Sequence, residues 1–337
     1  MRLPARGLVA LVLVVAAVVG VVALAANRIE DPALQVEIAR LPATVASIEQ
    51  VDRDLDPYAG YGTWVDVFDY APAYQDGGEP AVSPADLDAM ADRGVRTLFL
   101  QAARNDARSP DRLVDEALLA EFLFRAHTRG MRVVGWYLPR FADVDHDLAL
   151  LQEIRDFEAL GHRFDGVAVD IEFTEDVPAP DERNDRLIEL SERFREESDD
   201  EALGAIVLPP VLLEVVNPDF WPDFPWEELE RHYDVWLPMS YWTLRREDSG
   251  YRDGYTYNGE STERLRDNLG NSRAVVHGIG GIGDEAAPLD LAAFAESLAD
   301  TRSVGGSIYD WSTLTDEGRR AIEAAFDQGA AADLPEP

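Results

Sequence analysis

The chain of 337 residues contains neither lysine nor cysteine, so all 30 of its basic residues are arginine. Schiff-base enzymes, P-loop nucleotidases and pyridoxal enzymes are excluded, because each needs a specific lysine. Disulfides, thiolate zinc sites, iron–sulfur clusters and cysteine nucleophiles are excluded by the lack of cysteine. Positive charge is scarce too, since 65 acidic residues give a formal net charge of −35. A surface this negative repels phosphate backbones, so we expect no nucleic-acid partner.

The only long hydrophobic run lies at the N-terminus. Leu8 to Ala26 is apolar and uncharged and follows Arg2 and Arg6, which is the pattern of an export segment. Small residues at 23–25 fit a cleavage site, but a run of about 19 apolar residues is also long enough to span a bilayer. A cleaved signal peptide and a transmembrane anchor both remain open for residues 1–26. Either predicts an extracytoplasmic protein, secreted or anchored to the cell membrane, that meets the membrane only through this segment.

From Gly62 onward one unit recurs eight times: a β-branched or aromatic run, a polar loop, and an amphipathic stretch. Successive runs start 31 to 40 residues apart, which predicts βαβ units in an α/β fold, a single (β/α)8 TIM barrel. A doubly wound open sheet is the alternative, but no glycine-rich phosphate turn follows the first run. The predicted segments are a linker at 27–60, a barrel domain at 61–328 that contains all eight runs, and a disordered tail at 329–337. The runs are 62–70, 95–103, 132–140, 166–173, 203–210, 234–242, 274–283 and 305–311.

Two acidic residues stand near the end of the fourth run. Asp170 and Glu172 are two residues apart, so on a strand they project to the same face, and in this type of barrel the strand ends carry the active site. Two inward carboxylates repel one another, which raises the pKa of at least one of them. A carboxyl group that stays protonated near neutrality suits a general acid. The alternative is a structural network in which Arg104 or Arg140 neutralises the pair.

The fourth run, with Asp165-Gly166 followed by Asp170 and Glu172, resembles the strand-four signature of family-18 glycoside hydrolases, the chitinase group. The sixth run carries Met239-Ser240-Tyr241, which is similar to the M-x-Y motif of that family, and Gly305-Gly306 opens the eighth run as in many members. The resemblance implies a TIM barrel of the (trans)glycosidase superfamily. Most of residues 60–325 also look like exported barrel proteins of high-GC actinobacteria.

The resemblance implies roles for three catalytic residues. Glu172 would protonate the glycosidic oxygen, Asp170 would orient and polarise the substrate's N-acetyl group, and Tyr241 would hydrogen-bond the carbonyl of that group. The sequence departs from the family pattern where Ala168 replaces the middle aspartate and Trp242 replaces the aspartate after the tyrosine. Because the residues that hold an N-acetyl group are incomplete, the sequence predicts a glycosidase-like barrel and not a chitinase in particular.

Aromatic and polar residues gather where the runs end. Flat aromatic walls with polar neighbours suit the apolar faces of sugar rings, although a single aromatic residue is more often part of a core. Gln101 and Arg104 are expected to bind hydroxyls or a carboxylated sugar, with a structural salt bridge as the alternative. If a second carboxylate acts, Asp69, Glu214 and Asp310 are available. The predicted substrate-binding residues are Asp69, Gln101, Arg104, Trp136, Tyr137, Met239, Trp242, His277, Tyr309, Asp310 and Trp311.

Metal chemistry is not predicted. The alternating acids of Asp143–Asp147 resemble a calcium loop, but the glycine and glutamate that such a loop needs are missing. We interpret this stretch as the start of a helix. We expect no cofactor, a monomer, and a carbohydrate substrate.

Two functions remain open. One is an extracytoplasmic glycoside hydrolase or transglycosidase acting on a polysaccharide or oligosaccharide. The other is a non-catalytic glycan-binding protein of the cell surface, suggested by the incomplete N-acetyl site.

Overall fold

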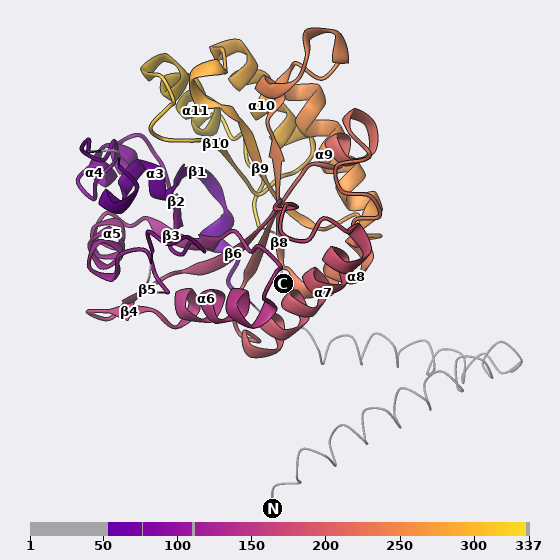
Figure 1. The fold of residues 1–337 in the computed structure, drawn as a ribbon. Helices are drawn as coiled ribbons and strands as arrows, with labels where there is room; N and C mark the ends of the chain where they lie inside the picture. The colour runs from indigo at the N-terminus through magenta and orange to yellow at the C-terminus, as the bar shows by residue number, and fades with distance from the viewer. Residues whose placement is uncertain (1–52, 76, 110–111, 335–337) are drawn as a thin grey trace, which may run out of the picture. The chain divides into compact units, whose positions relative to one another are not determined.

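Eight parallel strands close into a barrel in the computed structural model, which describes residues 53–75, 77–109 and 112–334 (Figure 1). The strands follow one another around the barrel in the order in which they occur in the chain, and helices surround them on the outside. The predicted (β/α)8 fold is therefore confirmed. The predicted export segment or anchor lies outside the described residues, and in the described part of the chain no helix is long and apolar enough to cross a membrane.

Each barrel strand lies at one of the eight predicted runs but ends earlier than the run does. The runs are longer than the strands because the loops that follow the strands also contain apolar and aromatic residues. A small antiparallel hairpin, which the sequence did not indicate, precedes the fourth barrel strand. The barrel strands are β1 (Gly60–Val65), β2 (Thr97–Gln101), β3 (Arg132–Tyr137), β6 (Gly166–Ile171), β7 (Leu203–Val207), β8 (Val235–Ser240), β9 (Val275–Ile282) and β10 (Gly305–Tyr309), and the hairpin pairs β4 (Glu158–Ala159) with β5 (His162–Arg163).

Five of the helices in the described part of the chain begin at side-chain caps, and the longer helices bury one apolar face. Asp115 and Asp143, for example, accept hydrogen bonds from backbone N–H groups of the first turn of α5 and α6. The helices are α3 (Val67–Tyr70), α4 (Asp86–Asp92), α5 (Glu116–Thr128), α6 (Val144–Asp156), α7 (Pro180–Glu197), α8 (Trp226–Leu229), α9 (Gly254–Asn268), α10 (Pro288–Asp300) and α11 (Asp316–Asp327). Short turns are η1 (Asp56–Tyr58), η2 (Pro72–Tyr74), the π-turn η3 (Leu212–Val216), η4 (Glu230–His232), η5 (Trp242–Leu244), η6 (Glu247–Ser249) and η7 (Gly283–Glu285).

The amino-terminal end of the barrel is closed by Tyr58, whose side chain is 0% exposed. Its hydroxyl donates to the carbonyl oxygens of Val167 and Ala202, at 2.9 and 3.1 Å. Gly166 and Gly204 make room for the ring, since a Cβ at either position would lie within 3 Å of it. Residues 53–59 therefore form the floor of the barrel, although the sequence had placed them in the linker.

The chain also stays packed beyond α11. Ala330 is buried, and the N–H of Ala332 donates to the carbonyl of Ser303 at 2.8 Å. The stretch 329–334 thus covers the barrel where a disordered tail was expected, because a small residue and a backbone hydrogen bond hold it in place.

Candidate active site

The mouth of the barrel, the end at which the strands terminate, is reached by alternate residues of each strand. Gly166 faces inward, because its Cβ would touch Tyr58 in the floor. Ala168 and Asp170 follow at the strand spacing of two and therefore face inward as well, one layer higher each time. Glu172 comes directly after β6 and is half-buried. The structure thus places both acidic residues of the fourth run at the mouth.

The pair Asp170–Glu172 is buried without a cation. Asp170 is 6% exposed, and its Oδ1 atom has no hydrogen-bond partner among the described residues. Burial, followed by the charge of Glu172, raises the pKa of Asp170 well above its usual range. Burial also raises the pKa of Glu172. The pair therefore holds a proton at a pH at which exposed carboxyl groups have lost theirs.

Neither of the arginines considered as neutralising partners pairs with these acids. Arg140 forms its ion pair with Asp176, at 2.7 Å between Nε and Oδ2. Arg104 has no ion pair among the described residues and lies over aromatic rings, 4.8 Å from the ring centre of Phe68 and 5.9 Å from that of Tyr74. The salt bridge considered for Arg104 is likewise not observed in this part of the chain.

Tyr241 stands at the end of β8 in the field of two groups of acids. Burial raises the pKa of its hydroxyl first, and the charges of Glu172 and Asp170 raise it further, followed by those of Asp310 and Asp66. The hydroxyl therefore stays protonated and acts as a donor. Its ring lies 5.8 Å from the ring of Tyr309 on β10.

The second group of acids is the three-aspartate cluster of Asp66, Asp69 and Asp310. One carboxylate oxygen from each lies within 4.8 Å of the other two. The Tyr309 hydroxyl donates to Asp66 Oδ2 at 2.5 Å. Burial, Asp310 and Asp66, in that order, raise the pKa of Asp69 to about 7. Sequence reasoning named Asp69 and Asp310 but missed Asp66, which its position two residues after the inward Trp64 would have indicated.

Two further side chains at the mouth each have one N–H group without a partner among the described residues. Gln101, on β2, is 1% exposed; its Oε1 accepts the Val67 N–H at 3.2 Å, and its Nε2 has no partner among the described residues. Trp136, on β3, is buried against Trp64 at 5.9 Å between ring centres, and its Nε1 is equally without a partner there. A buried donor without an acceptor costs about 1–3 kcal/mol. Both donors are unsatisfied within the described part of the chain.

Two predicted binding residues face the helices instead of the mouth. Tyr137 follows the inward Trp136, so it points outward, where its hydroxyl donates to Asp147 at 2.5 Å. Trp242 follows the inward Tyr241 and is completely buried, 5.4 Å from the ring of Phe294 on α10. Tyr137 reaches the outer face of β3 by strand alternation, and Trp242 is turned toward α10 by η5, which begins after β8 ends. Neither aromatic ring is therefore available to a sugar.

His277 and Trp311 are also withdrawn from the mouth. His277 is 0% exposed near the floor, where its ring nitrogens lie 2.8 Å from the Tyr58 carbonyl and 2.9 Å from Ser307 Oγ. Burial lowers its pKa to about 4, so the ring is neutral. The ring of Trp311 is covered by Arg319, whose guanidinium carbon is 4.4 Å from the ring centre.

The remaining predicted residues likewise divide between the inward face of the barrel and its outer wall. Met239 is buried on the inward face of β8, below Tyr241. Glu214 lies on η3 and forms an ion pair with Arg264 of α9 at 2.7 Å, so it serves the outer wall. The expected helix start is confirmed, because Asp143 caps α6 and Asp147 accepts the Phe141 N–H at 2.8 Å.

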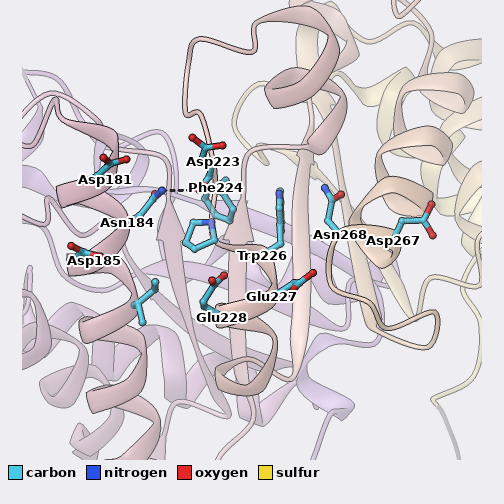
Figure 2. A pocket seen from close by; sticks show the side chains of 12 residues that line it. Asp181, Asn184, Asp185, Asp223, Phe224, Trp226, Glu227, Glu228, Asp267 and Asn268 are labelled. Carbon is cyan, nitrogen blue, oxygen red and sulfur yellow. Dashed lines mark hydrogen bonds between the residues drawn. The ribbon is translucent and has the colours of Figure 1, made fainter.

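Two hollows open on the outside of the barrel. The larger, of about 680 Å³, lies among α7, α8 and α9, and Figure 2 shows the carboxylates of Asp181, Asp223 and Glu227 around it, with Trp226 in its wall. The other, of about 650 Å³, lies along α9 and α10. None of the predicted site residues lines either hollow.

No protein-family model and no curated protein sequence matches the chain. Solved structures are similar in fold. An endo-1,4-β-mannanase from Rhizomucor miehei has a TM-score of 0.59 at 10% identity, covering 82% of this chain and 96% of that one. A class V chitinase from Nicotiana has a TM-score of 0.54 at 11% identity, covering 80% and 99%. A chitinase from Chromobacterium violaceum has 0.53 at 10% identity, covering 79% and 98%. The chain thus has a glycosidase-like TIM-barrel fold, as the sequence predicted.

Proposed function

We propose that the chain is a glycoside hydrolase or transglycosidase that binds an oligosaccharide or polysaccharide at the mouth of the barrel. The observation that carries this proposal is the buried pair Asp170–Glu172 at the end of β6, which has no cationic partner in the described part of the chain. An acidic pair in such a place is costly unless it is used. The partnerless atoms of Gln101 and Trp136 beside it suit the hydroxyls of a sugar.

The chemistry follows from the different surroundings of the two carboxyl groups. The two carboxyl groups share a proton that exposed carboxyl groups would have lost, because burial and their mutual repulsion raise the pKa of the pair. Glu172 is the more accessible of the two, so it is the group that passes this proton to the glycosidic oxygen as the C–O bond breaks. The negative charge that then remains on the pair stabilises the positive charge that develops at the anomeric carbon. The bond to that carbon is then taken by water in hydrolysis or by a sugar hydroxyl in transfer. Tyr241 donates a hydrogen bond that orients the sugar.

The proposal does not extend to chitin as the substrate. Ala168 faces inward below Asp170 and offers a methyl group where the resembling family has a carboxylate. The mannanase and the chitinases named above act on different polysaccharides, so the shared fold does not select among them. We further propose that the protein acts outside the cytoplasm, which is supported by the apolar, uncharged segment at its N-terminus.

The test is the release of reducing ends from a panel of polysaccharides. Glu172→Gln keeps the shape of the side chain but removes the acid, so cleavage should fall at least about 100-fold. Glu175→Gln is the matched control, because Glu175 is exposed on the same loop and should be dispensable. Equal turnover of wild type and Glu172→Gln would overturn the assignment. If no glycan is cleaved but both proteins bind an oligosaccharide equally, the non-catalytic alternative holds.

A further inference from the structure

The three-aspartate cluster has negative charge but no cation. Asp69 and Asp310 are 7% and 6% exposed, and Asp66 is half-buried. No arginine or histidine of the described residues forms an ion pair with any of the three. Elsewhere in the described part of the chain arginine neutralises partly buried acids, as Arg195 does beside Asp234 at 2.6 Å. Three neighbouring carboxylates without such a partner are a site for a cation that the protein itself does not supply.

A second, independent observation points to a ligand at the same place. Gln101 lies beside Asp66 in the register of β1 and β2, since Val65 pairs with Leu100. Its amide is fixed by the Val67 N–H, in the turn that connects Asp66 to Asp69, and its Nε2 is buried there without a partner. The amide is not part of the acidic cluster, and a buried donor of this kind needs an acceptor. A ligand that satisfied both features would have a cationic group and an uncharged oxygen close to it.

The spacing of the carboxylates suits an ammonium group. An ammonium has three N–H bonds at tetrahedral angles, so acceptors about 2.8 Å from its nitrogen are about 4.6 Å from each other. One oxygen from each aspartate lies within 4.8 Å of the other two. The sequence has no lysine that could provide this group. An ammonium bound at this cluster would therefore have to come from a ligand.

The position of the cluster connects it with the catalytic pair. Asp66 and Asp310 come directly after β1 and β10, at the same end of the barrel as Glu172. Tyr241 lies in the field of both acidic groups, and its ring touches Tyr309, whose hydroxyl is bonded to Asp66. A sugar chain that reaches Glu172 thus comes within range of the cluster.

We propose that the three-aspartate cluster binds a free amino group of the glycan, so that the ligand of this mouth is an oligosaccharide with unacetylated amino sugars. The inference rests on the proposed function in taking the mouth as a glycan site. Asp66 and Asp310 accept N–H bonds of the ammonium as carboxylates, Asp69 accepts through the carboxyl oxygen that bears no proton, and Gln101 Nε2 donates to a hydroxyl of the same or the adjoining sugar. The incomplete N-acetyl site agrees with a substrate that lacks the acetyl group.

Three tetrasaccharides with the same β-1,4 backbone test this proposal, because they differ only at one substituent. The glucosamine tetramer carries an ammonium, cellotetraose a hydroxyl, and the N-acetylglucosamine tetramer an acetamide. We measure their binding to the Glu172→Gln protein by calorimetry at pH 6 and low salt, where no cleavage interferes. The glucosamine tetramer should bind at least about tenfold more tightly than the other two, as expected for charge-assisted hydrogen bonds.

Asp310→Asn should reduce the preference for the glucosamine tetramer over cellotetraose from at least about tenfold to about one. Retained cellotetraose binding also shows that the variant is folded, and Asp66→Asn provides a second variant with the same expectation. Asp223→Asn, in the exposed acidic hollow of Figure 2, is the matched control and should change nothing. Equal affinity for the three oligosaccharides, or no effect of Asp310→Asn, would overturn the proposal.

The lack of lysine allows a test that needs no variant. A carbodiimide joins carboxylates to primary amines, and apart from its N-terminus this chain offers none. With the glucosamine tetramer present, peptide mapping should therefore find the sugar coupled to Asp69 or Asp310. Coupling spread evenly over the exposed acids would contradict the proposal.

Titration with Ca²⁺, Mg²⁺ and Mn²⁺ tests whether the cluster binds a divalent metal ion instead of an amino group. Binding of a divalent ion that is lost in Asp310→Asn would make the cluster a metal site and overturn the amine assignment. The outcome is separable from that of the proposed function. If the glucosamine tetramer binds through the cluster and no glycan is cleaved, the proposed hydrolase function is overturned and the amine site stands. If glycans without amines are cleaved and amines give no advantage in binding, the amine site is overturned and the hydrolase function stands.

Discussion

At the scale of single residues, the spacing of Asp170 and Glu172 was sufficient to predict that both face the mouth. The same rule of alternation explains Trp136 and Tyr137 on β3, whereas Tyr241 and Trp242 are separated by the turn η5 that follows β8. Trp136 and Tyr241 face inward, and their neighbours Tyr137 and Trp242 pack against helices. The burial of single residues was not predictable, because His277 is withdrawn by contacts with Tyr58 and Ser307 that are distant in sequence.

Asp69 makes the stability of the protein depend on pH. Its carboxyl group has a pKa of about 7 in the folded protein and about 4 when unfolded. Between these values the folded state binds more protons, so the free energy of unfolding decreases as the pH rises from about 4 to about 7. Asp69→Asn should remove this pH dependence. As the pH rises from about 4 to about 7, the free energy of unfolding of the variant should therefore increase relative to that of wild type, by on the order of a few kcal/mol.

Urea unfolding at several pH values checks this prediction. The exposed Asp223 provides the control, because Asp223→Asn should give a curve parallel to that of wild type. Parallel curves for Asp69→Asn and wild type would show that Asp69 titrates normally in the folded protein.

At the scale of elements, all eight barrel strands were predictable because each coincides with a β-branched or aromatic run. Shorter elements were not. The hairpin β4–β5 has only two residues in each strand, and η1 takes three residues from a stretch without hydrophobic periodicity. The role of η1 depends on Tyr58 meeting β6 and β7, which are more than 100 residues away in the chain. No local pattern encodes such a contact.

The contact between Tyr58 and the strand glycines can be tested with one methyl group. At Gly204 a Cβ would lie 2.8 Å from Tyr58 Cε1 and 2.9 Å from a methyl carbon of Leu237. Gly204→Ala should therefore destabilise the protein by about 1–3 kcal/mol, the usual cost of overpacking. Gly259→Ala is the control: Gly259 lies within α9 with nothing within 4 Å, so alanine should stabilise by about 0.5–1 kcal/mol. Equal denaturation midpoints for the two variants would contradict this account of the floor.

At the scale of the whole molecule, the acids and the arginines have different places. Arginine connects elements, as Arg195 does by donating to the carbonyls of His232 and Ser198 and to Asp234. Most other acids lie on exposed helices and loops, for example in the stretch 196–200. Composition alone predicted a net charge of −35 but not where the few buried acids stand. Their location followed from strand position.

The surplus of negative charge should make stability depend on salt. Like charges on the surface repel one another, and salt screens this repulsion. Raising KCl from about 0.05 M to 1 M at pH 7 should increase the free energy of unfolding by on the order of 1–2 kcal/mol, as measured by thermal or urea unfolding. Near the isoelectric point of about 4.3 the net charge vanishes, so the effect should largely disappear. A melting temperature independent of KCl at pH 7 would rule the explanation out.

The closed floor gives the barrel a single entrance. Because the ring and hydroxyl of Tyr58 fill its amino-terminal end, a glycan cannot thread through the strands and has to lie across the loops above them. Substrate and product must then use the same opening in turn. If the proposed amino sugar is the substrate, departure of its charged product from the acids around Glu172 is a step that can limit turnover, and it would become faster with rising ionic strength.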